Sequence, residues 1–272
     1  MTNSIRLFRG AFGHVSVLNV VSNLVTHAHA EAHLIVWLDG DAGEMTIGDE
    51  TVRLGPGVAA GVNSFQPHRH DFSGGATSGQ FLAFYIDPEW ARRRRRLEPN
   101  RPLFSAASVM VDAWLHRAAV ALHDELNDGN ADEMVVYEIE RLIDSLIDAA
   151  DASRPRKAGS GTNPMLDFRV RKAIDLMRTN VCERVCFDEV ARSVGLSRPH
   201  FFALFKEQTN LTPNVYWNTL RMEEALRQLQ SEDSLISVAC NLGFTTAGNF
   251  SRFFRDHAGV PPTLYRNAAR AA

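Results

Sequence analysis

The hydrophobic pattern of the chain changes character near its middle. Residues 14–86 contain short apolar or alternating runs, and turn residues such as Gly55-Pro56-Gly57 divide them. Many short strands at even spacing are typical of a sandwich or a jelly-roll barrel. Apolar positions at helical spacing follow over residues 107–126 and 131–149, which predicts two helices after the barrel.

The second of these helices has an apolar face that is broader than one small barrel can cover. Ile139, Ile143 and Leu146 belong to this face. The surplus predicts a homodimer contact through the helices at 107–149, and packing on the barrel is the alternative. Five arginines, Arg92 to Arg96, precede these helices. At helical spacing they point all round the helix, which favours a solvated surface over an anion-binding site.

A stretch of small, polar, Gly- and Pro-rich residues separates two folding units. Residues 151–164 read DASRPRKAGSGTNP, which is the composition of a linker. The sequence therefore predicts one domain at 1–150 and a second at 165–272. The fold class that follows is α+β, with a barrel first and an all-α domain second.

The second domain contains two short predicted helices around a turn. Apolar residues from Phe187 to Val194 keep the i, i+3, i+4, i+7 spacing of one helix face. Gly195 ends this helix, and Ser197 suits the N-cap of the next one. Two short helices that meet at a glycine turn form the helix-turn-helix pattern.

The chain then repeats this pattern. Residues 235–244 match residues 187–196 at a constant offset of 48, and the offset becomes 49 beyond the turn, where Phe250 matches Phe201. The repetition predicts two helix-turn-helix units within the second domain. A connecting helix between them would let the two units enter successive major-groove segments of one DNA face.

Composition narrows the class of protein. The chain has 272 residues, 45% hydrophobic and 22% charged, as is ordinary for a soluble globular protein of about two domains. No apolar run approaches the roughly 18 residues of a membrane span, and the N-terminus lacks the apolar core of a signal peptide. Three cysteines, an odd number, argue against a disulfide framework. These features predict a cytoplasmic protein without a membrane partner.

Charge is distributed unevenly between the two domains. Residues 164–272 contain 14 Lys and Arg against 11 Asp and Glu, whereas the preceding residues contain 15 against 21. The second domain is thus the basic one, and this agrees with a nucleic-acid partner.

Histidines recur at alternate positions in the first domain. His27, His29 and His33, with Glu31 between the last two, would all face one side of a strand and could aim several ligands at one centre. This spacing resembles the first cupin motif, although His33 stands where an acid belongs. His68 resembles the single histidine of the second cupin motif, with His70 as a close substitute.

The cupin resemblance implies a β-barrel over roughly residues 10–86 with a ligand site inside it. Imidazole ligands suit one divalent ion such as Zn, Ni, Cu or Fe. The alternative is a vestigial histidine set around an organic effector of unknown identity, or around nothing. The predicted metal ligands are His27, His29, His33 and His68.

Four motifs of the second domain carry a further resemblance. They are GLSRPHFFALFK at 195–206, GF at 243–244, NFSRFF at 249–254 and GVPPTLYR at 259–266. Together they resemble the AraC/XylS family of bacterial transcription regulators, in which a cupin joined to this kind of domain is a familiar arrangement. The resemblance implies double-stranded DNA as the partner of this domain.

The family's base-reading positions fall on different chemistry in the two units. Arg252 suits guanine and Asn249 suits adenine, whereas the first unit is apolar at these positions and reads thymine methyls at best. Arg252 as a plain phosphate contact and Phe202 as plain core are the alternatives. The implied base-reading residues are Pro199, Phe202, Ala203, Gly248, Asn249 and Arg252. Phosphate contacts are expected from the flanking Arg198, His200 and Lys206.

The leading functional hypothesis is a sequence-specific DNA-binding regulator, not an enzyme, whose cupin senses a small ligand or a divalent metal. A metal-dependent cupin enzyme with an accessory DNA-binding domain is the main alternative. The third hypothesis is a ligand-free architectural DNA binder, which assigns no function to the barrel. The sequence leaves open whether the protein activates or represses transcription, and RNA polymerase is a candidate partner for activation.

Overall fold

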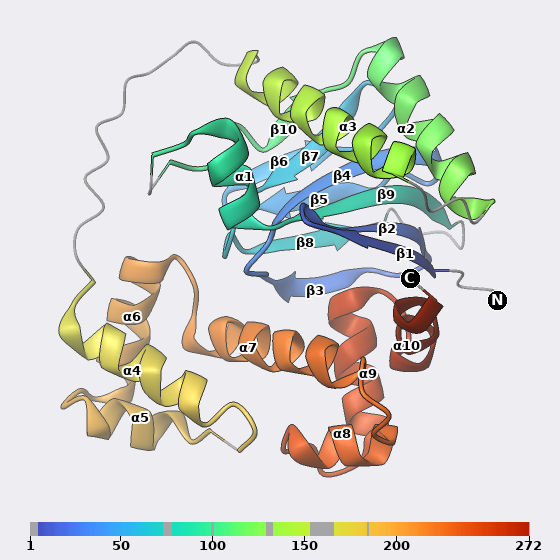
Figure 1. Ribbon diagram of the computed structural model, residues 1–272. Coiled ribbons are helices and arrows are strands. Elements are labelled where there is room, and N and C mark those ends of the chain that lie inside the picture. The colour runs from blue at the N-terminus through green and yellow to red at the C-terminus, as the bar shows by residue number, and fades with distance from the viewer. Residues whose placement is uncertain are drawn as a thin grey trace.

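The computed structural model describes residues 5–72, 78–98, 101–128, 133–152, 166–183 and 185–271. Most of the predicted linker at 151–164 lies outside these residues. Figure 1 shows a β-rich N-terminal domain above a helical C-terminal domain. This mixed α+β architecture agrees with the predicted order of a β-rich part and then a helical part.

Two antiparallel sheets form the N-terminal domain. The six-stranded sheet has the order β1 (Ile5–Gly10), β2 (Gly13–Val20), β9 (Gly79–Ile86), β4 (Ala32–Gly40), β7 (Val58–Val62) and β10 (Ser108–Met110). The four-stranded sheet has the order β3 (Leu24–His27), β8 (His68–Asp71), β5 (Glu44–Ile47) and β6 (Glu50–Arg53). The sheets share a buried core, because Met45 and Ile47 of the smaller sheet pack with Ile35 and Phe81 of the larger one.

Among the described residues, three helices follow the main strands: the two longer ones that the sequence predicts and a short one at the arginine run, where Asp87 to Trp90 predict a helix start. They are α1 (Pro88–Arg95), α2 (Ala113–Asn127) and α3 (Glu133–Ala152). The predicted helix at 107–126 begins too early, because Ser108–Met110 pair with β7 and the side chain of Val109 is fully buried. Asp112 then caps α2, since its carboxylate accepts hydrogen bonds from the backbone N–H groups of Trp114 and Leu115.

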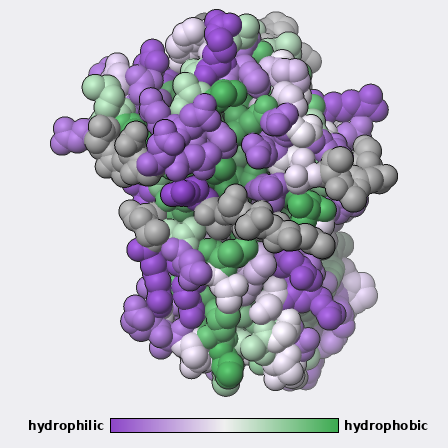
Figure 2. Space-filling view, turned by 90° about the vertical axis from the view of Figure 1, so that its right-hand side faces the viewer, coloured by the Kyte–Doolittle hydropathy of each residue, from purple (hydrophilic) through white to green (hydrophobic). Residues whose placement is uncertain are grey.

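The broad apolar face of α3 packs inward on the N-terminal domain. Ile139, Ile143 and Leu146 are fully buried in the same core as β-strand residues such as Leu34 and Phe84. The argument for a dimer through this face is therefore wrong, because the face packs on the strands of its own domain, as the alternative proposed. On the side that Figure 2 shows, hydrophilic residues predominate in the upper half, with some hydrophobic residues among them.

The arginine run of α1 is partly engaged with α3. The Arg94 guanidinium lies 2.8 Å from a carboxylate oxygen of Glu140 and 2.8 Å from one of Asp144. Arg95 pairs with Asp148 as well as with Asp144. These partly exposed ion pairs connect α1 to α3. The interpretation of the arginine run as a solvated surface did not include this contact.

Within the described residues, seven helices form the C-terminal domain. They are α4 (Phe168–Thr179), α5 (Phe187–Ser193), α6 (Arg198–Thr209), α7 (Pro213–Gln228), α8 (Leu235–Asn241), α9 (Ala247–Ala258) and α10 (Pro262–Ala271). The helix pairs α5–α6 and α8–α9 lie at opposite ends of α7 (Figure 1). Gly195 and Gly243 turn each pair with φ of 74° and 71°, a conformation that favours glycine.

The two domains contact each other through β1 and β3. Leu7 belongs to the core of α8–α10, and Ala28 belongs to the core of α4–α7. The Thr219 hydroxyl of α7 donates a hydrogen bond to the Ala28 carbonyl at 3.1 Å, and Arg9 donates one to the Tyr265 hydroxyl at 3.2 Å. Within the described part of the chain, no helix is long and apolar enough to cross a membrane.

Candidate functional site

The predicted histidine ligands meet, but not on one strand. β3 ends at His27 and β4 begins at Ala32, so His29 lies in the connection between them. His68 pairs with His27 across β3 and β8. One ring nitrogen from each of His27, His29 and His68 lies within 4.8 Å of the other two, and we call these three residues the histidine trio. A chain bend, rather than strand alternation, brings the trio together.

The other two predicted histidines lie beside the trio. His33 stacks on His29 with ring centroids 4.4 Å apart, and its Nε2 is buried without a hydrogen-bond partner among the described residues. It falls outside the group whose nitrogens converge. The Nε2 atom of His70 lies 3.1 Å from the Ala42 carbonyl, so this nitrogen is engaged elsewhere.

Burial and hydrogen bonding prepare the trio for a cation. Burial lowers the pKa of His68 to about 4 and holds the pKa values of His27 and His29 well below 6.5, so all three rings are neutral near pH 7. Nδ1 of His27 donates to the Val25 carbonyl at 2.6 Å, and Nδ1 of His68 donates to the Gln66 carbonyl at 2.9 Å. Because a carbonyl only accepts, Nε2 of both rings carries the lone pair that a metal needs.

The cavity at these histidines is small and reaches the domain boundary. It has a volume of about 40 Å³ and is lined by His27 and His68 of the trio, by residues of β2, β4 and β9, and by His257 and Ala258 at the end of α9. Such a space holds an ion with a few waters. Organic ligands use pockets of roughly 300–1,000 Å³. The cavity therefore suits a metal ion better than an organic effector.

On the first unit, the predicted DNA-binding residues share one exposed side of α6. Arg198, Pro199, His200, Ala203 and Lys206 are exposed, whereas Phe202 is half-buried. The Arg198 guanidinium lies 3.2 Å from an Asp188 carboxylate oxygen and 5.4 Å from the centroid of the Phe202 ring. Ser197 holds the N-cap position of α6, but its side chain makes no capping hydrogen bond.

On the second unit, the predicted residues lie in the first half of α9. Gly248, Asn249 and Arg252 are all exposed. Thr246 caps this helix by accepting a hydrogen bond from the Asn249 backbone N–H at 3.1 Å, which fixes the start of the helix. The Asn249 side-chain amide donates to the Thr245 hydroxyl at 2.8 Å. Hydrogen-bonding groups thus concentrate on this helix.

Sequence reasoning missed His257, which brings α9 to the histidine cavity. Its ring centroid lies 6.0 Å from that of His27. A histidine on the apolar face of a helix, spaced four residues from Phe253, was a signal for a buried imidazole. No local pattern indicated its partner, because residues 27 and 257 meet only through packing of the two domains.

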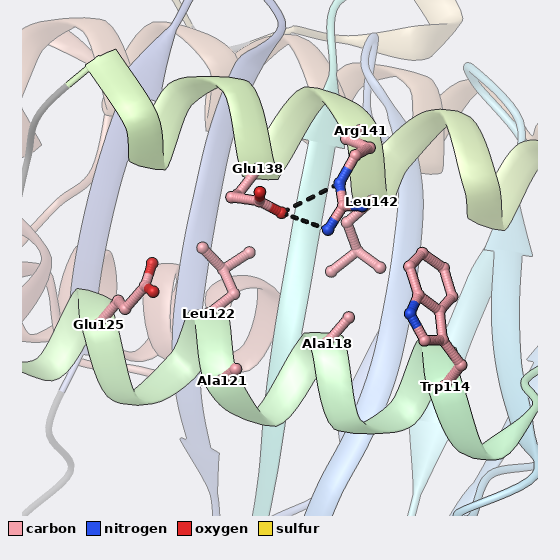
Figure 3. Close-up of a pocket in the computed structure, with 8 residues that line it drawn as sticks. All are labelled: Trp114, Ala118, Ala121, Leu122, Glu125, Glu138, Arg141 and Leu142. Atoms are coloured by element: carbon pink, nitrogen blue, oxygen red, sulfur yellow. Dashed lines mark hydrogen bonds and ion pairs between the residues drawn. The ribbon is translucent and has the colours of Figure 1, made fainter.

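A groove between α2 and α3 was also missed. It has a volume of about 230 Å³, and Figure 3 shows Trp114 and Leu122 of α2 facing Glu138, Arg141 and Leu142 of α3. Arg141 pairs with Glu138 at 2.7 Å, and its guanidinium lies 5.4 Å from the Trp114 ring centroid. The groove is lined by both charged and apolar side chains and lies on the outer side of the N-terminal domain.

Known proteins share both the helical domain and the whole fold. Residues 190–268 match the family model described as a helix-turn-helix domain. The probable transcriptional regulator LumQ of Photobacterium leiognathi is 25% identical over 88% of this chain and 91% of its own length. The HTH-type transcriptional regulator GbdR of Pseudomonas aeruginosa is 30% identical over 61% of this chain and 43% of its own length.

Solved structures of ToxT from Vibrio cholerae have the same fold across both domains. The apo structure has a TM-score of 0.58 at 10% identity and covers 97% of this chain and 99% of its own. A second, bound to an unsaturated fatty acid, has a TM-score of 0.55 at 11% identity, covering 98% and 96%. The sequence relatives and the helix-turn-helix match agree with the resemblance found in the sequence, and the chain is a transcriptional regulator with an AraC-type DNA-binding domain.

Proposed function

We propose that this regulator senses a divalent metal ion in its N-terminal domain, which we interpret as a cupin-type barrel. The observation that carries the proposal is the histidine trio, whose ring nitrogens lie within 4.8 Å of one another and two of whose members, His27 and His68, line a cavity of about 40 Å³. Neutral imidazoles are good ligands of Zn, Cu, Ni and Fe, and metal sites of this kind use carbonyl-oriented histidines. His33 stacks on His29 beside the trio but lies outside the group whose nitrogens converge.

An organic effector and a catalytic role both fit this site less well than a regulatory metal ion. A fatty acid, which one ToxT structure contains, is far larger than this cavity. A catalytic role needs an acid or base beside the metal. Among the described residues, the group that converges here contains histidines only. Regulation by the bound ion is therefore favoured over turnover of a substrate.

The second helix pair supplies most of the sequence readout in this proposal. Both helix pairs act as helix-turn-helix units, with α6 and α9 in successive major-groove segments about 34 Å apart. Arg252 takes guanine O6 and N7, and Asn249 takes adenine, each worth about 1–3 kcal/mol of discrimination. Pro199, Phe202 and Ala203 add apolar contacts, while Arg198, His200 and Lys206 contact phosphates.

The outer side of α2 and α3 is the proposed homodimer contact, in place of the buried face. Trp114, Met134 and Tyr137 are 45%, 63% and 59% exposed there. Large exposed apolar side chains beside a groove mark interaction surfaces. Sedimentation of a Tyr137→Asp variant as a monomer, with the unmodified chain as a dimer, would support this contact. A monomeric unmodified chain would contradict it.

Metal analysis tests the sensor proposal. Full-length protein incubated with Zn²⁺ and desalted is expected to retain about one ion per chain, and a His27→Ala/His68→Ala double variant is expected to retain almost none. His123→Ala, which alters a histidine on α2 away from the cavity, serves as the control and should bind as the unmodified chain does. Equal retention by the double variant, or no retention by the unmodified chain with any of the four candidate ions, would retire the proposal.

A further inference from the structure

Helix α9 runs from the proposed base-reading residues to the histidine cavity. Arg252 is exposed on the first half of the helix, whereas His257 and Ala258 line the cavity at its end. His257 follows Arg252 by five positions, which is about 7–8 Å along a helix. The same rigid element therefore contacts both places, and Figure 1 shows its end next to the N-terminal strands.

The end of α9 is seated closely on the N-terminal domain. Gly259 follows the helix with φ of 72°. A Cβ atom at this glycine would lie 3.4 Å from the Leu24 side chain and 3.9 Å from that of Val20. These are ordinary van der Waals distances for a Cβ atom, so the glycine leaves space in which the end of α9 can move toward β3.

His257 has a nitrogen that no protein group uses. Its Nδ1 donates to the Phe253 carbonyl at 2.7 Å, so its Nε2 carries the lone pair. That Nε2 is buried and has no hydrogen-bond partner among the described residues. A buried polar atom without a hydrogen-bond partner destabilises the folded state, so a ligand that pairs with it is favoured. The side chain is only 6% exposed, its ring centroid lies 6.0 Å from that of His27, and it lines the same cavity as His27 and His68.

We infer that His257 is the ligand through which the DNA-binding domain takes part in the metal site. An ion held by the histidine trio takes Nε2 of His257 as a further ligand and draws the end of α9 toward β3. This inference rests on the proposed metal-sensing function and adds its regulation. A tetrahedral site of four imidazoles needs metal–nitrogen distances of about 2.0–2.1 Å.

The present geometry leaves room for a switch. His257 is not in the group whose nitrogens lie within 4.8 Å of one another, so it must approach the trio when an ion binds. If His257 reaches the ion in only one arrangement of α9, the ion binds that arrangement more tightly. The difference in affinity between the two arrangements then shifts the equilibrium toward the one with the extra ligand.

A ring contact links His257 to the rest of the second helix pair. Phe253 lies 4.2 Å from His257 between ring centroids, and the Arg221 guanidinium of α7 lies 5.3 Å from Phe253 and 3.8 Å from Phe244. Movement of His257 is thereby passed to packed residues around the turn of α8–α9. The first helix pair has no counterpart, because the position that matches His257 in α6 is Gln208.

Co²⁺ binding to the full-length protein tests the inference, since the visible spectrum of Co²⁺ reports its coordination. The unmodified chain is compared with His257→Ala, His257→Gln and His33→Ala. His33→Ala is the matched control, because it removes another buried histidine with an unpartnered Nε2 from within the N-terminal domain. Circular dichroism establishes that each variant is folded, and the glutamine variant covers a failure of the alanine variant to fold.

Removal of His257 is expected to weaken Co²⁺ binding by at least about 10- to 100-fold, because loss of a mere hydrogen-bond partner of a metal ligand already has an effect of this size. It should also change the visible spectrum, because water replaces a nitrogen ligand. A purely structural role of His257 would alter affinity without altering the spectrum. In the unmodified chain alone, Co²⁺ should slow amide hydrogen exchange in residues 253–258.

The outcomes separate this inference from the proposed function. If folded His257 variants keep the affinity and spectrum of the unmodified chain while His27→Ala/His68→Ala loses binding, His257 is no ligand and the sensor proposal stands. If the unmodified chain binds no Co²⁺, or if the double variant binds as well as it does, both fail.

Discussion

Helices α6 and α9 occupy equivalent places in the two copies of one sequence pattern, yet their surroundings differ. α6 exposes Pro199 and Ala203 where α9 exposes Gly248 and Arg252. The guanidinium of Arg198 on α6 is held by Asp188 and lies against Phe202. The end of α9 lies instead against the N-terminal domain, where His257 lines the histidine cavity. A repeated core can thus support two helices with different surface chemistry.

The buried residues show why the two copies keep the same core. Phe205 in α6 and Phe254 in α9 are both fully buried and match at the offset of 49. Each packs against an aromatic residue of the following helix, Tyr216 in the first copy and Tyr265 in the second, with ring centroids 5.5 Å apart in both. Packing therefore constrains the repeat, whereas the exposed positions are free to differ.

The largest expected effect comes from this shared core. Phe205→Ala and Phe254→Ala should each lower the free energy of unfolding by about 3–5 kcal/mol, because each leaves a cavity the size of a phenyl ring. Urea unfolding of the two variants beside the unmodified chain measures this. A loss below about 1 kcal/mol for one of them alone would show that the two copies are not packed equivalently.

Next in size is a pH effect at Glu223, on the connecting helix α7. Burial, followed by the charge of Glu31, raises the pKa of Glu223 from 4.5 to about 7. Its raised pKa stabilises the folded state below about pH 4.5, and this contribution is lost as the pH rises through about 7. Glu223→Gln should therefore raise the free energy of unfolding near pH 8 by up to about 3 kcal/mol, and by less near pH 5.

Glu224 is the matched control on the same helix. A hydrogen bond from Arg227 lowers the pKa of Glu224, so its carboxylate stabilises the folded state above its unfolded pKa and loses that effect as the pH falls. Glu224→Gln should thus destabilise the chain near pH 8. The same pH dependence in both variants would mean that the burial of Glu223 against the N-terminal domain is not maintained in solution.

A smaller effect is expected from base readout. Arg252→Ala should reduce discrimination at one base pair by about 1–3 kcal/mol, as measured on DNA sites selected from a random pool by the unmodified chain. Ala203→Ser alters the matching position of α6 and should change discrimination by less than about 1 kcal/mol. Undiminished sequence preference in the Arg252 variant would move the main readout away from α9.

The smallest effect concerns phosphate contacts. Lys206→Ala and Arg255→Ala change the matching cations of α6 and α9. If Lys206 contacts a phosphate, its removal should weaken binding to all DNA sequences alike and reduce the salt slope by about 1. Binding titrations at several salt concentrations measure the slope. An unchanged salt slope for Lys206→Ala would show that Lys206 of α6 does not contact the DNA backbone.

Local patterns predicted much of the fold. The repeat at 187–206 and 235–255 indicated both helix pairs, because periodicity and glycine turns are local signals. Residues 107–111 were assigned to a helix wrongly, since pairing of β10 with β7 overrides their helical periodicity. The dimer argument failed for a similar reason, because the sequence could not show how much of α3 the six-stranded sheet covers.

The site was predictable in composition but not in geometry. The spacing of His27 and His29, with His68 further along, indicated a shared centre, although a bend between β3 and β4 produces it rather than one strand. The role of His257 depends on how the C-terminal domain packs on β3. Such contacts join residues that are far apart in the chain, and no local pattern specifies them.

The most direct test of the account is the zinc X-ray absorption spectrum of the full-length protein loaded with one equivalent of Zn²⁺. The account predicts nitrogen ligands at about 2.0–2.1 Å, with outer-shell scattering from at least three imidazole rings. A spectrum dominated by oxygen ligands, with scattering from one imidazole or none, would contradict metal sensing by the histidine trio.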